Sequence, residues 1–330
     1  MATADMLMRG LAPRLAAANL APPSAVLLRG VRQRAADEAW EQHRREAAAA
    51  ATAITRREEG ARERLAAVAE AALHDLRARA ALLARGAGGA LALAVRLDQE
   101  FMDPDAREHM DDPAFDEGKR RGAVASLDRM NEGAGIYELF ADVLDPWLPQ
   151  GGALLDLAAG HGGFAVWLAR RARAQGRPLR ITATDLHDSY LALGRERARA
   201  EGLEVELRPQ DALDLSNLTP GAFDVVLCTQ AVHHFPAGLI SVMVEEATRI
   251  AGRAVVLVDG CRSALFAGVL VTLGLVGFRD PTFTHDSFAS FRRFFVPEEL
   301  GLLARLGAGA RPVEAKFRAP NHCVVTIPTR

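Results

Sequence analysis

The sequence has few cysteines and almost no net charge, and each shortage excludes a class of protein. Only three cysteines occur in 330 residues, and no two of them form a Cys-x-x-Cys pair. Cys228, Cys261 and Cys323 are therefore expected as buried, reduced thiols rather than as disulfides or zinc ligands. The formal net charge of −2 creates no overall field that would favour binding to nucleic acid or to an anionic membrane.

Long apolar runs are also missing. The N-terminal residues contain no apolar run that fits a signal peptide, and 9–34 are interpreted as an Ala/Arg-rich helical segment. The longest apolar run, 264–278, is shorter than the about 20 residues that cross a bilayer, and glycines interrupt it. We therefore expect no transmembrane segment and a cytoplasmic location.

The composition that is present divides the chain near residue 100. Residues 1–100 are rich in Ala, Arg, Glu and Leu, and apolar residues recur at helical spacing over 33–84. Breaks are expected at Gly60 and at the glycines of 86–89. This all-α region is expected to pack on the rest of its own chain, on a second subunit in a homodimer, or on another partner. Residues 101–150 predict a helical lead-in that covers the active site.

From residue 151 to residue 330, strand and helix patterns alternate. This alternation is typical of an α/β fold with a parallel sheet covered on both faces. The predicted parallel strands are 152–155, 179–184, 204–208, 223–228 and 253–258. Two more strands, 313–318 and 323–327, flank a short link and predict a C-terminal hairpin, which adds an antiparallel strand to the sheet.

The segment 156–163 reads Asp-Leu-Ala-Ala-Gly-His-Gly-Gly and joins the first strand to a helix. Such a corner can bind a nucleotide, because glycines admit a ligand to the backbone and the helix N-terminus offers free N–H groups. Asp185 ends the second strand, where an acid can accept hydrogen bonds from ribose hydroxyls. Asp211 follows the third strand, where a carboxylate can accept one from an exocyclic amine.

Together with the Val-His-His-Phe turn after the fourth strand and the terminal hairpin, this ordered set resembles the class I S-adenosylmethionine-dependent methyltransferases. The resemblance covers roughly residues 120–330 and implies a Rossmann-like, seven-stranded, mostly parallel sheet with the cofactor at the C-terminal ends of the strands. Single features allow other readings: Asp185 as a helix cap, Asp211 as a solvated loop acid, and the first two strands as an NAD-binding domain. The ordered set favours the methyltransferase.

The resemblance also implies the residues that bind S-adenosyl-L-methionine, with S-adenosyl-L-homocysteine as product. They are Asp156, Ala158, Gly160, Gly162, Asp185, Leu186, Asp211, Ala212, Thr229 and Gln230. In the family, the glycine turn lies under the methionine and ribose, and Asp185 holds the ribose hydroxyls. Asp211 binds the adenine amine, and Thr229 and Gln230 lie near the sulfonium. Many members have glycine where this chain has Ala158, so a slightly different loop is expected.

A looser resemblance, to bacterial small-molecule methyltransferases, covers the lead-in and an insertion at 262–300. The insertion predicts an apolar helix over 264–278, followed by several phenylalanines, and in this group it covers the substrate. Walls of this kind suit an apolar or aromatic acceptor, although the helix could instead pack on the sheet or on another subunit. We hypothesise O- or C-methylation of a polyketide, phenol or lipid-like compound.

Three histidines are candidate general bases for an acceptor that must lose a proton. His285, beside Asp286, faces the acceptor if the insertion covers the cleft, and otherwise packs or caps a loop. His233 and His234 are adjacent, so their side chains are expected to point apart, and no metal site is predicted. Weaker candidates, which would close the site from the N-terminal side, are Arg129, Asn131 and Tyr137.

Two other classes of function stay open. One is methylation of RNA or protein, with the N-terminal helices as a docking module. The balanced charge and the lack of an Asn/Asp-Pro-Pro-Tyr/Phe tetrad after the fourth strand count against it, whereas a basic stripe on those helices would favour it. The other is a non-catalytic assembly subunit with this fold, against which Asp185 and Asp211 argue.

Overall fold

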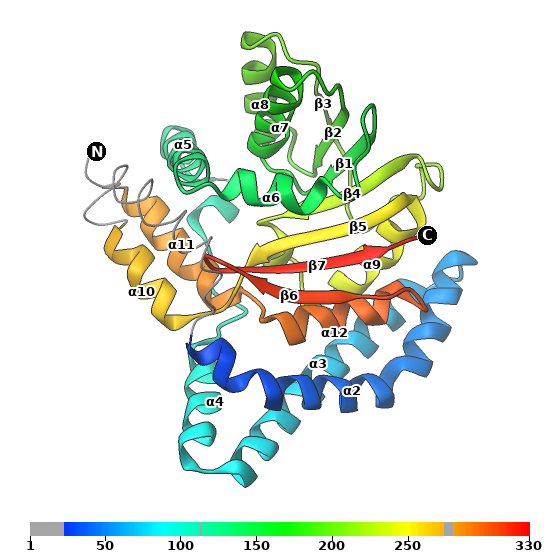
Figure 1. Ribbon diagram of the computed structural model, residues 1–330, viewed down its shortest axis with the longest axis vertical. Coiled ribbons are helices and arrows are strands. Elements are labelled where there is room, and N and C mark those ends of the chain that lie inside the picture. Colours follow the sequence, from blue (N-terminus) through cyan, green and yellow to red (C-terminus); the bar gives the residue numbers. More distant parts are fainter. Residues whose placement is uncertain (1–22, 113, 274–279) are drawn as a thin grey trace.

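The centre of the molecule is a seven-stranded sheet with the order β3-β2-β1-β4-β5-β7-β6 (Figure 1). The computed structural model describes residues 23–112, 114–273 and 280–330. The strands are β1 (Ala153–Leu157), β2 (Arg180–Asp185), β3 (Glu206–Pro209), β4 (Phe223–Thr229), β5 (Ala251–Gly260), β6 (Glu314–Arg318) and β7 (His322–Pro328). The first five pair in parallel, and β7 pairs antiparallel with β5 and β6. The predicted fold class is confirmed.

The strand order reverses beside β1, and this reversal places the site. Within β1, Leu155 pairs with Thr182 of β2 on one side and with Val226 of β4 on the other. Connections from these strands therefore leave in opposite directions and open a crevice at their C-terminal ends. All five residues of β1 are buried, as expected for a parallel strand with helices on both faces.

Two apolar clusters cover the two faces of the sheet. One cluster joins the sheet to α9 (Ala237–Ile250) and α12 (Pro297–Ala308), and the N-terminal helices extend it outward. The other joins the opposite face to α6 (Ile136–Leu144), α7 (Gly163–Ala174) and α8 (Asp188–Ala200). The sheet is thus the middle layer, and the crevice lies at the C-terminal ends of its parallel strands.

The helical N-terminal region consists of α2 (Pro23–Thr55), α3 (Ala61–Ala87) and α4 (Gly89–Phe101), and its residues 1–22 lie outside the described residues. Helix α3 packs on α9 and α2 packs on α12 (Figure 1). The approach of α3 to α9 is close, because a methyl group on Gly238 would lie 2.2 Å from the carbonyl oxygen of Ala66. Of the expected partners for this region, its own chain is therefore one.

The lead-in and the insertion gather near the C-terminal ends of β4 and β5 (Figure 1). The lead-in contains η1 (His109–Asp111) and α5 (Glu117–Gly133), and a short turn η2 (Val232–His234) follows β4. The insertion contains α10 (Ala264–Leu273) and α11 (Pro281–Arg293); the remainder of the predicted apolar helix, 274–278, lies outside the described residues. Among the helices of the described ranges, none combines the length and apolar character that crossing a membrane requires.

Candidate functional site

Two adjoining cavities open at the C-terminal edge of the sheet. The first, which we call the polar cavity, has a volume of about 380 Å³ and lies over the glycine turn. The second, the apolar cavity, has a volume of about 260 Å³ and lies between α5, α10 and α11. The residues that line both are Glu108, Met110, Leu127, Gln230 and His234. A ligand in one cavity can therefore touch a ligand in the other.

Asp185 holds the glycine turn of the polar cavity in place. Its carboxylate accepts hydrogen bonds from the backbone N–H of Gly160 and of His187, both at 2.9 Å. Ala158 has a φ of 51°, in the left-handed region that glycine adopts at less cost. The alanine is therefore accommodated within the turn. Gln230, on the opposite wall, also has a positive φ of 52°, and residues strained in this way often mark functional sites.

Asp156 forms part of the cavity lining and is nearly inaccessible to water, with 1% of its surface exposed. Its Oδ1 atom has no hydrogen-bond partner among the described residues. Burial, together with the nearby charge of Asp185, raises the pKa of Asp156 to about 8. A cationic group of a ligand would satisfy this carboxylate. The ammonium and sulfonium groups of S-adenosylmethionine meet that requirement, so the cavity fits the cofactor.

The cofactor residues predicted from the sequence divide into two groups. Those that line the polar cavity are Asp156, Ala158, Gly160, Asp185, Thr229 and Gln230. The other four lie elsewhere. Gly162 caps α7, where a methyl group would lie 2.6 Å from Leu207, and Leu186 is exposed. The carboxylate of Asp211 accepts the N–H of Leu213 at 2.8 Å, and Ala212 belongs to the core. Their roles in binding stay predictions.

Helix α5 closes the polar cavity through side chains that contact the sheet. Asn131 and Gln230 exchange two amide hydrogen bonds, of 2.8 and 3.2 Å. The carboxylate of Asp128 accepts a hydrogen bond of 2.5 Å from the Tyr137 hydroxyl. It also lies 3.0 Å from Nε2 of His161 in the glycine turn. Asn131 and Tyr137 were predicted near the site. Asp128 and His161 were missed, because only the folded chain brings them together.

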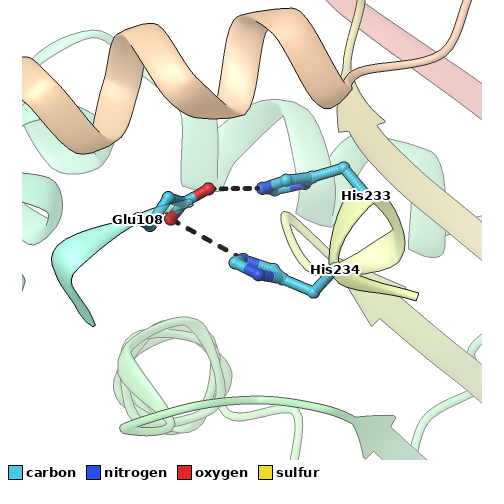
Figure 2. A group of neighbouring side chains, drawn as sticks. All are labelled: Glu108, His233 and His234. Carbon is cyan, nitrogen blue, oxygen red and sulfur yellow. Dashed lines mark ion pairs between the residues drawn. The ribbon is translucent and has the colours of Figure 1, made fainter. Parts of the chain in front are cut away.

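Beyond the shared wall, two adjacent histidines face one carboxylate (Figure 2). Nε2 of His233 lies 3.4 Å from Oε1 of Glu108, and Nε2 of His234 lies 3.9 Å from Oε2. The other ring nitrogen of each also meets an acid: Nδ1 of His233 lies 2.9 Å from Asp259, and Nδ1 of His234 lies 3.2 Å from Asp111. Sequence reasoning singled out the two histidines but none of the three acids.

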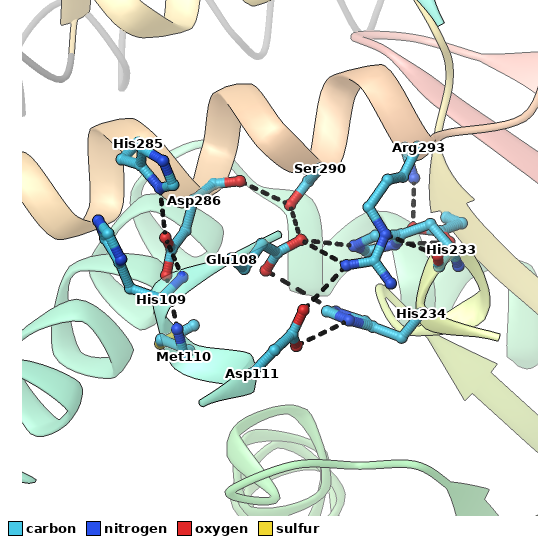
Figure 3. A network of polar contacts seen from close by, with 12 residues as sticks. Glu108, His109, Met110, Asp111, His233, His234, His285, Asp286, Ser290 and Arg293 are labelled. Atoms are coloured by element: carbon cyan, nitrogen blue, oxygen red, sulfur yellow. Dashed lines mark hydrogen bonds and ion pairs between the residues drawn. The ribbon is translucent and has the colours of Figure 1, made fainter. Parts of the chain in front are cut away.

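Helix α11 ties this cluster to the insertion (Figure 3). Ser290 donates a hydrogen bond of 2.6 Å to Glu108, and Arg293 forms an ion pair of 3.0 Å with Asp111. Burial opposes a charge on His233, but the carboxylates of Asp259 and Glu108 outweigh it and raise the pKa of the imidazole to about 9. The cluster links the lead-in, η2 and α11 at the polar end of the apolar cavity.

His285, the third candidate base, lines neither cavity. Its side chain is 49% exposed, its Nδ1 lies 2.9 Å from Asp286, and its ring stacks on His109 at 4.0 Å. Asp286 also accepts the backbone N–H of His109 and of Met110 (Figure 3). The structure thus separates His285 from the other two histidines, and its role as a base stays a prediction.

The walls of the apolar cavity come mainly from the insertion and from α5. They include Leu127, Met130, Phe266, Val269, Leu270, Phe283, Phe291 and Phe294. The predicted covering helix therefore contributes α10, and the phenylalanines that follow it contribute through α11. Apart from Glu108, His233 and His234, few charged side chains of the described residues line this cavity.

Residues 154–252 match a family model described as a methyltransferase domain. A ubiquinone/menaquinone biosynthesis C-methyltransferase of Brucella anthropi is 34% identical over 104 residues, which are 27% of this chain and 38% of that protein. A ubiquinone biosynthesis O-methyltransferase of Azotobacter vinelandii is 30% identical over 157 residues, 47% of this chain and 63% of that protein. The matches thus span less than two thirds of either relative.

Solved structures with a similar fold include a SAM-dependent methyltransferase from Aquifex aeolicus. It is 17% identical, with a TM-score of 0.43, over 58% of this chain and 89% of that chain.

The range 154–252 that matches the family model contains the glycine turn, the ends of β2 to β4 and both histidines of η2. It contains none of α5, α10 or α11, so the walls of the apolar cavity lie outside it.

Proposed function

Because the chain belongs to the class I S-adenosylmethionine-dependent methyltransferase family, we propose that it methylates an oxygen or carbon atom of a hydrophobic small molecule. S-Adenosylmethionine supplies a methyl group activated by a positive sulfur. The main support is that a polar cavity suited to this cofactor shares five lining residues with an apolar cavity.

On the cofactor side, we assign the binding to the glycine turn and the strand ends around it. Asp156 would pair with the cationic end of the methionine, and Asp185 would accept the ribose hydroxyls while it keeps Gly160 in position. Thr229 and Gln230 would border the sulfonium. Gln230 lines both cavities, so it would also contact the acceptor.

On the acceptor side, aromatic and aliphatic walls would bind an apolar ring or chain and exclude water. Aligning two reactants can account for about 7–11 kcal/mol of a barrier, and rigid walls of this kind provide alignment. Glu108 and His234 would contact the atom that receives the methyl group, because they lie where the cavities join. The relatives named for C- and O-methylation in quinone biosynthesis support a small-molecule acceptor.

The rival acceptors, RNA and protein, receive less support from the N-terminal helices. Most arginines on α2 and α3 pair with acids, which leaves few of them for a basic stripe. Such pairs join Arg34 to Glu38, Arg44 to Glu41, Arg62 to Glu246 and Arg77 to Glu299.

We further propose a cytoplasmic location for the protein. We also propose that it forms a homodimer through exposed leucines of α3 and α4, such as Leu82 and Leu93. Light scattering on the purified chain would test whether it is a dimer.

The decisive experiment pairs cofactor binding with a cavity-filling variant. Leu270→Trp on α10 narrows the apolar cavity, whereas Leu265→Trp on the same helix lies at an exposed position outside it. We expect S-adenosylhomocysteine to bind both variants like the unmodified chain in calorimetry. Methylation of phenolic or quinol acceptors by labelled S-adenosylmethionine should fall about tenfold only in Leu270→Trp, since an overfilled site typically loses 1–3 kcal/mol.

Three results would count against the proposal. Absence of S-adenosylhomocysteine binding would support the non-catalytic assembly subunit. Transfer of label to RNA or protein, with none to small apolar acceptors, would support the first rival. Equal effects of Leu270→Trp and Leu265→Trp would remove the apolar cavity as the acceptor site.

A further inference from the structure

The Glu108–His233–His234 cluster has the geometry of a metal site. Its three candidate ligand atoms lie within 4.8 Å of one another. A tetrahedral ion with ligands at about 2.0–2.2 Å holds its donor atoms roughly 3.4 Å apart, and the two distances to Glu108 are 3.4 and 3.9 Å. The adjacent side chains were expected to point apart. Instead their rings lie 4.2 Å from each other with a tilt of 37°, so both face Glu108 (Figure 2).

The second nitrogen of each ring is already held in the way that metal-binding histidines require. Such histidines usually donate their other N–H to a carboxylate, which fixes the ring and its tautomer. Asp259 serves His233 in this manner and also accepts the backbone N–H of His233 and of Gly260, both at 2.8 Å. Asp111 serves His234. Both histidines therefore present Nε2 toward Glu108.

The environment of His233 also leaves room for a closer ligand. Its Nε2 is buried, with 6% of the residue surface exposed, and makes no hydrogen bond among the described residues. Its contact with Glu108 is an ion pair at 3.4 Å, and a buried polar atom without a hydrogen bond is costly. An ion between the two histidines and Glu108 would bind this nitrogen directly.

We propose that Glu108, His233 and His234 bind one divalent first-row transition-metal ion at the polar end of the apolar cavity. Two histidines and one glutamate form a known ligand set for zinc sites that keep a position open for water or substrate, and imidazole suits zinc, iron and related ions. The open position faces the apolar cavity, because all three residues line it.

This inference deepens the proposed function and rests on it for the role of the ion. A hydroxyl oxygen bound to such an ion releases its proton to water more readily, so His234 acts as a ligand and no separate base is needed. The acceptor class narrows to apolar molecules that carry a hydroxyl or enol oxygen next to the methylated position.

A second group, His109, His285 and Asp286, provides an internal control. Its ligand atoms are also close together, but Asp286 already accepts two backbone N–H groups and both histidines are exposed. The proposal therefore requires that His285→Ala leaves metal binding unchanged.

The test uses the full-length chain, freed of metal with a chelator and titrated with Zn²⁺ and with Co²⁺. We expect one equivalent to bind and the Co²⁺ form to show the visible absorption of a low-coordinate nitrogen and oxygen site. Glu108→Gln and His234→Ala should each weaken Zn²⁺ binding at least tenfold. Asp259→Asn should weaken it about 10- to 100-fold, the usual effect of losing a carboxylate behind a metal-bound histidine.

Binding of less than one equivalent of ion would overturn the proposal, and His233 would then only form ion pairs with Glu108 and Asp259. Loss of metal binding in His285→Ala would also overturn it. Calorimetry with S-adenosylhomocysteine on the same samples separates the two claims. Cofactor binding without metal binding rejects the metal site alone, and metal binding without cofactor binding rejects the proposed function alone. Retained cofactor binding by His234→Ala, at an exposed position, shows that the variant is folded.

Discussion

Asp156 is expected to weaken the ligand-free fold and to strengthen ligand binding. Its pKa is raised from the ordinary 3.8 to about 8 by burial and by Asp185, so the folded chain holds a proton that the unfolded chain releases between these values. Stability from this group is therefore full below about pH 4 and falls as the pH rises toward 8. Each pKa unit corresponds to about 1.4 kcal/mol.

We predict that Asp156→Asn raises the free energy of unfolding of the ligand-free protein at pH 8 by a few kcal/mol and leaves it similar at pH 4. The variant should bind S-adenosylhomocysteine about ten- to a hundredfold more weakly, because a hydrogen bond to a charged group contributes about 1.5–3 kcal/mol. Denaturant titration and calorimetry measure the two effects. The exposed Asp142→Asn is the control, and a variant that is both less stable and unchanged in binding would contradict the argument.

Individual site residues were predictable only where a local pattern marked them. Asp185 and the glycine turn follow strands, and the end of a parallel strand is where such sheets bind ligands. Glu108 follows no predicted strand, and Asp259 follows the predicted strand 253–258 but was not singled out. They meet at His233 from segments about 150 residues apart, and each alone is an ordinary acid in the sequence. Ala158 was expected to make the loop slightly different from that of members with glycine, and this stays a prediction; the residue itself has a left-handed φ of 51°.

At the scale of elements, the position of α5 over the polar cavity depends on Asp128. This buried carboxylate accepts hydrogen bonds from Tyr137 and Arg197 and contacts His161. Burial opposes its charge, but these partners hold its pKa below the usual range. It therefore connects α5 to the glycine turn, to α6 and to α8 at once.

We predict that Asp128→Ala destabilises the protein by about 1–3 kcal/mol, because the variant leaves buried donors without an acceptor. Hydrogen exchange should quicken in α5 and in the glycine turn and stay unchanged in β6 and β7. Glu132→Ala is the matched control, since it removes another of the carboxylates that pair with Arg197 at an exposed position, where such a pair contributes about 0–1 kcal/mol. Equal exchange in both variants would contradict a specific role for Asp128.

Strands and the terminal hairpin were predictable because buried parallel strands form continuous apolar runs bounded by turn residues. The faces of helices were harder to predict. The apolar run of α10 is compatible with packing on the sheet, on a second subunit or around a cavity, and periodicity alone does not distinguish them. Its place in the cavity wall depends on α5 and α11, which lie about 140 and 20 residues away in the sequence.

At the scale of the whole molecule, a buried ion network joins the N-terminal helices to the domain that contains the sheet. Arg262, after β5, pairs with Glu299 of α12 at 2.8 Å and with Asp98 of α4 at 2.9 Å. Arg77 of α3 also pairs with Glu299, at 2.8 Å. Burial opposes the charge of Glu299, but the two arginines hold its pKa well below the usual range. Stability from this carboxylate is present above about pH 4.5 and is lost as the pH falls further.

We predict that Glu299→Gln destabilises the full-length chain by about 3–5 kcal/mol at pH 7, the usual cost when one partner of a buried ion pair is removed. The difference from the unmodified protein should shrink as the pH falls below about 4.5, because the unfolded chain then takes up a proton that the folded carboxylate does not. Denaturant titration at both pH values measures this difference in stability, and Glu314→Gln, which removes an exposed pair with Lys316, is the control.

Because the network spans these elements, we expect a single cooperative unfolding transition. Hydrogen exchange should then show that α2 and α3 lose protection together with α12. Separate transitions would show that the N-terminal helices fold independently of the domain that contains the sheet.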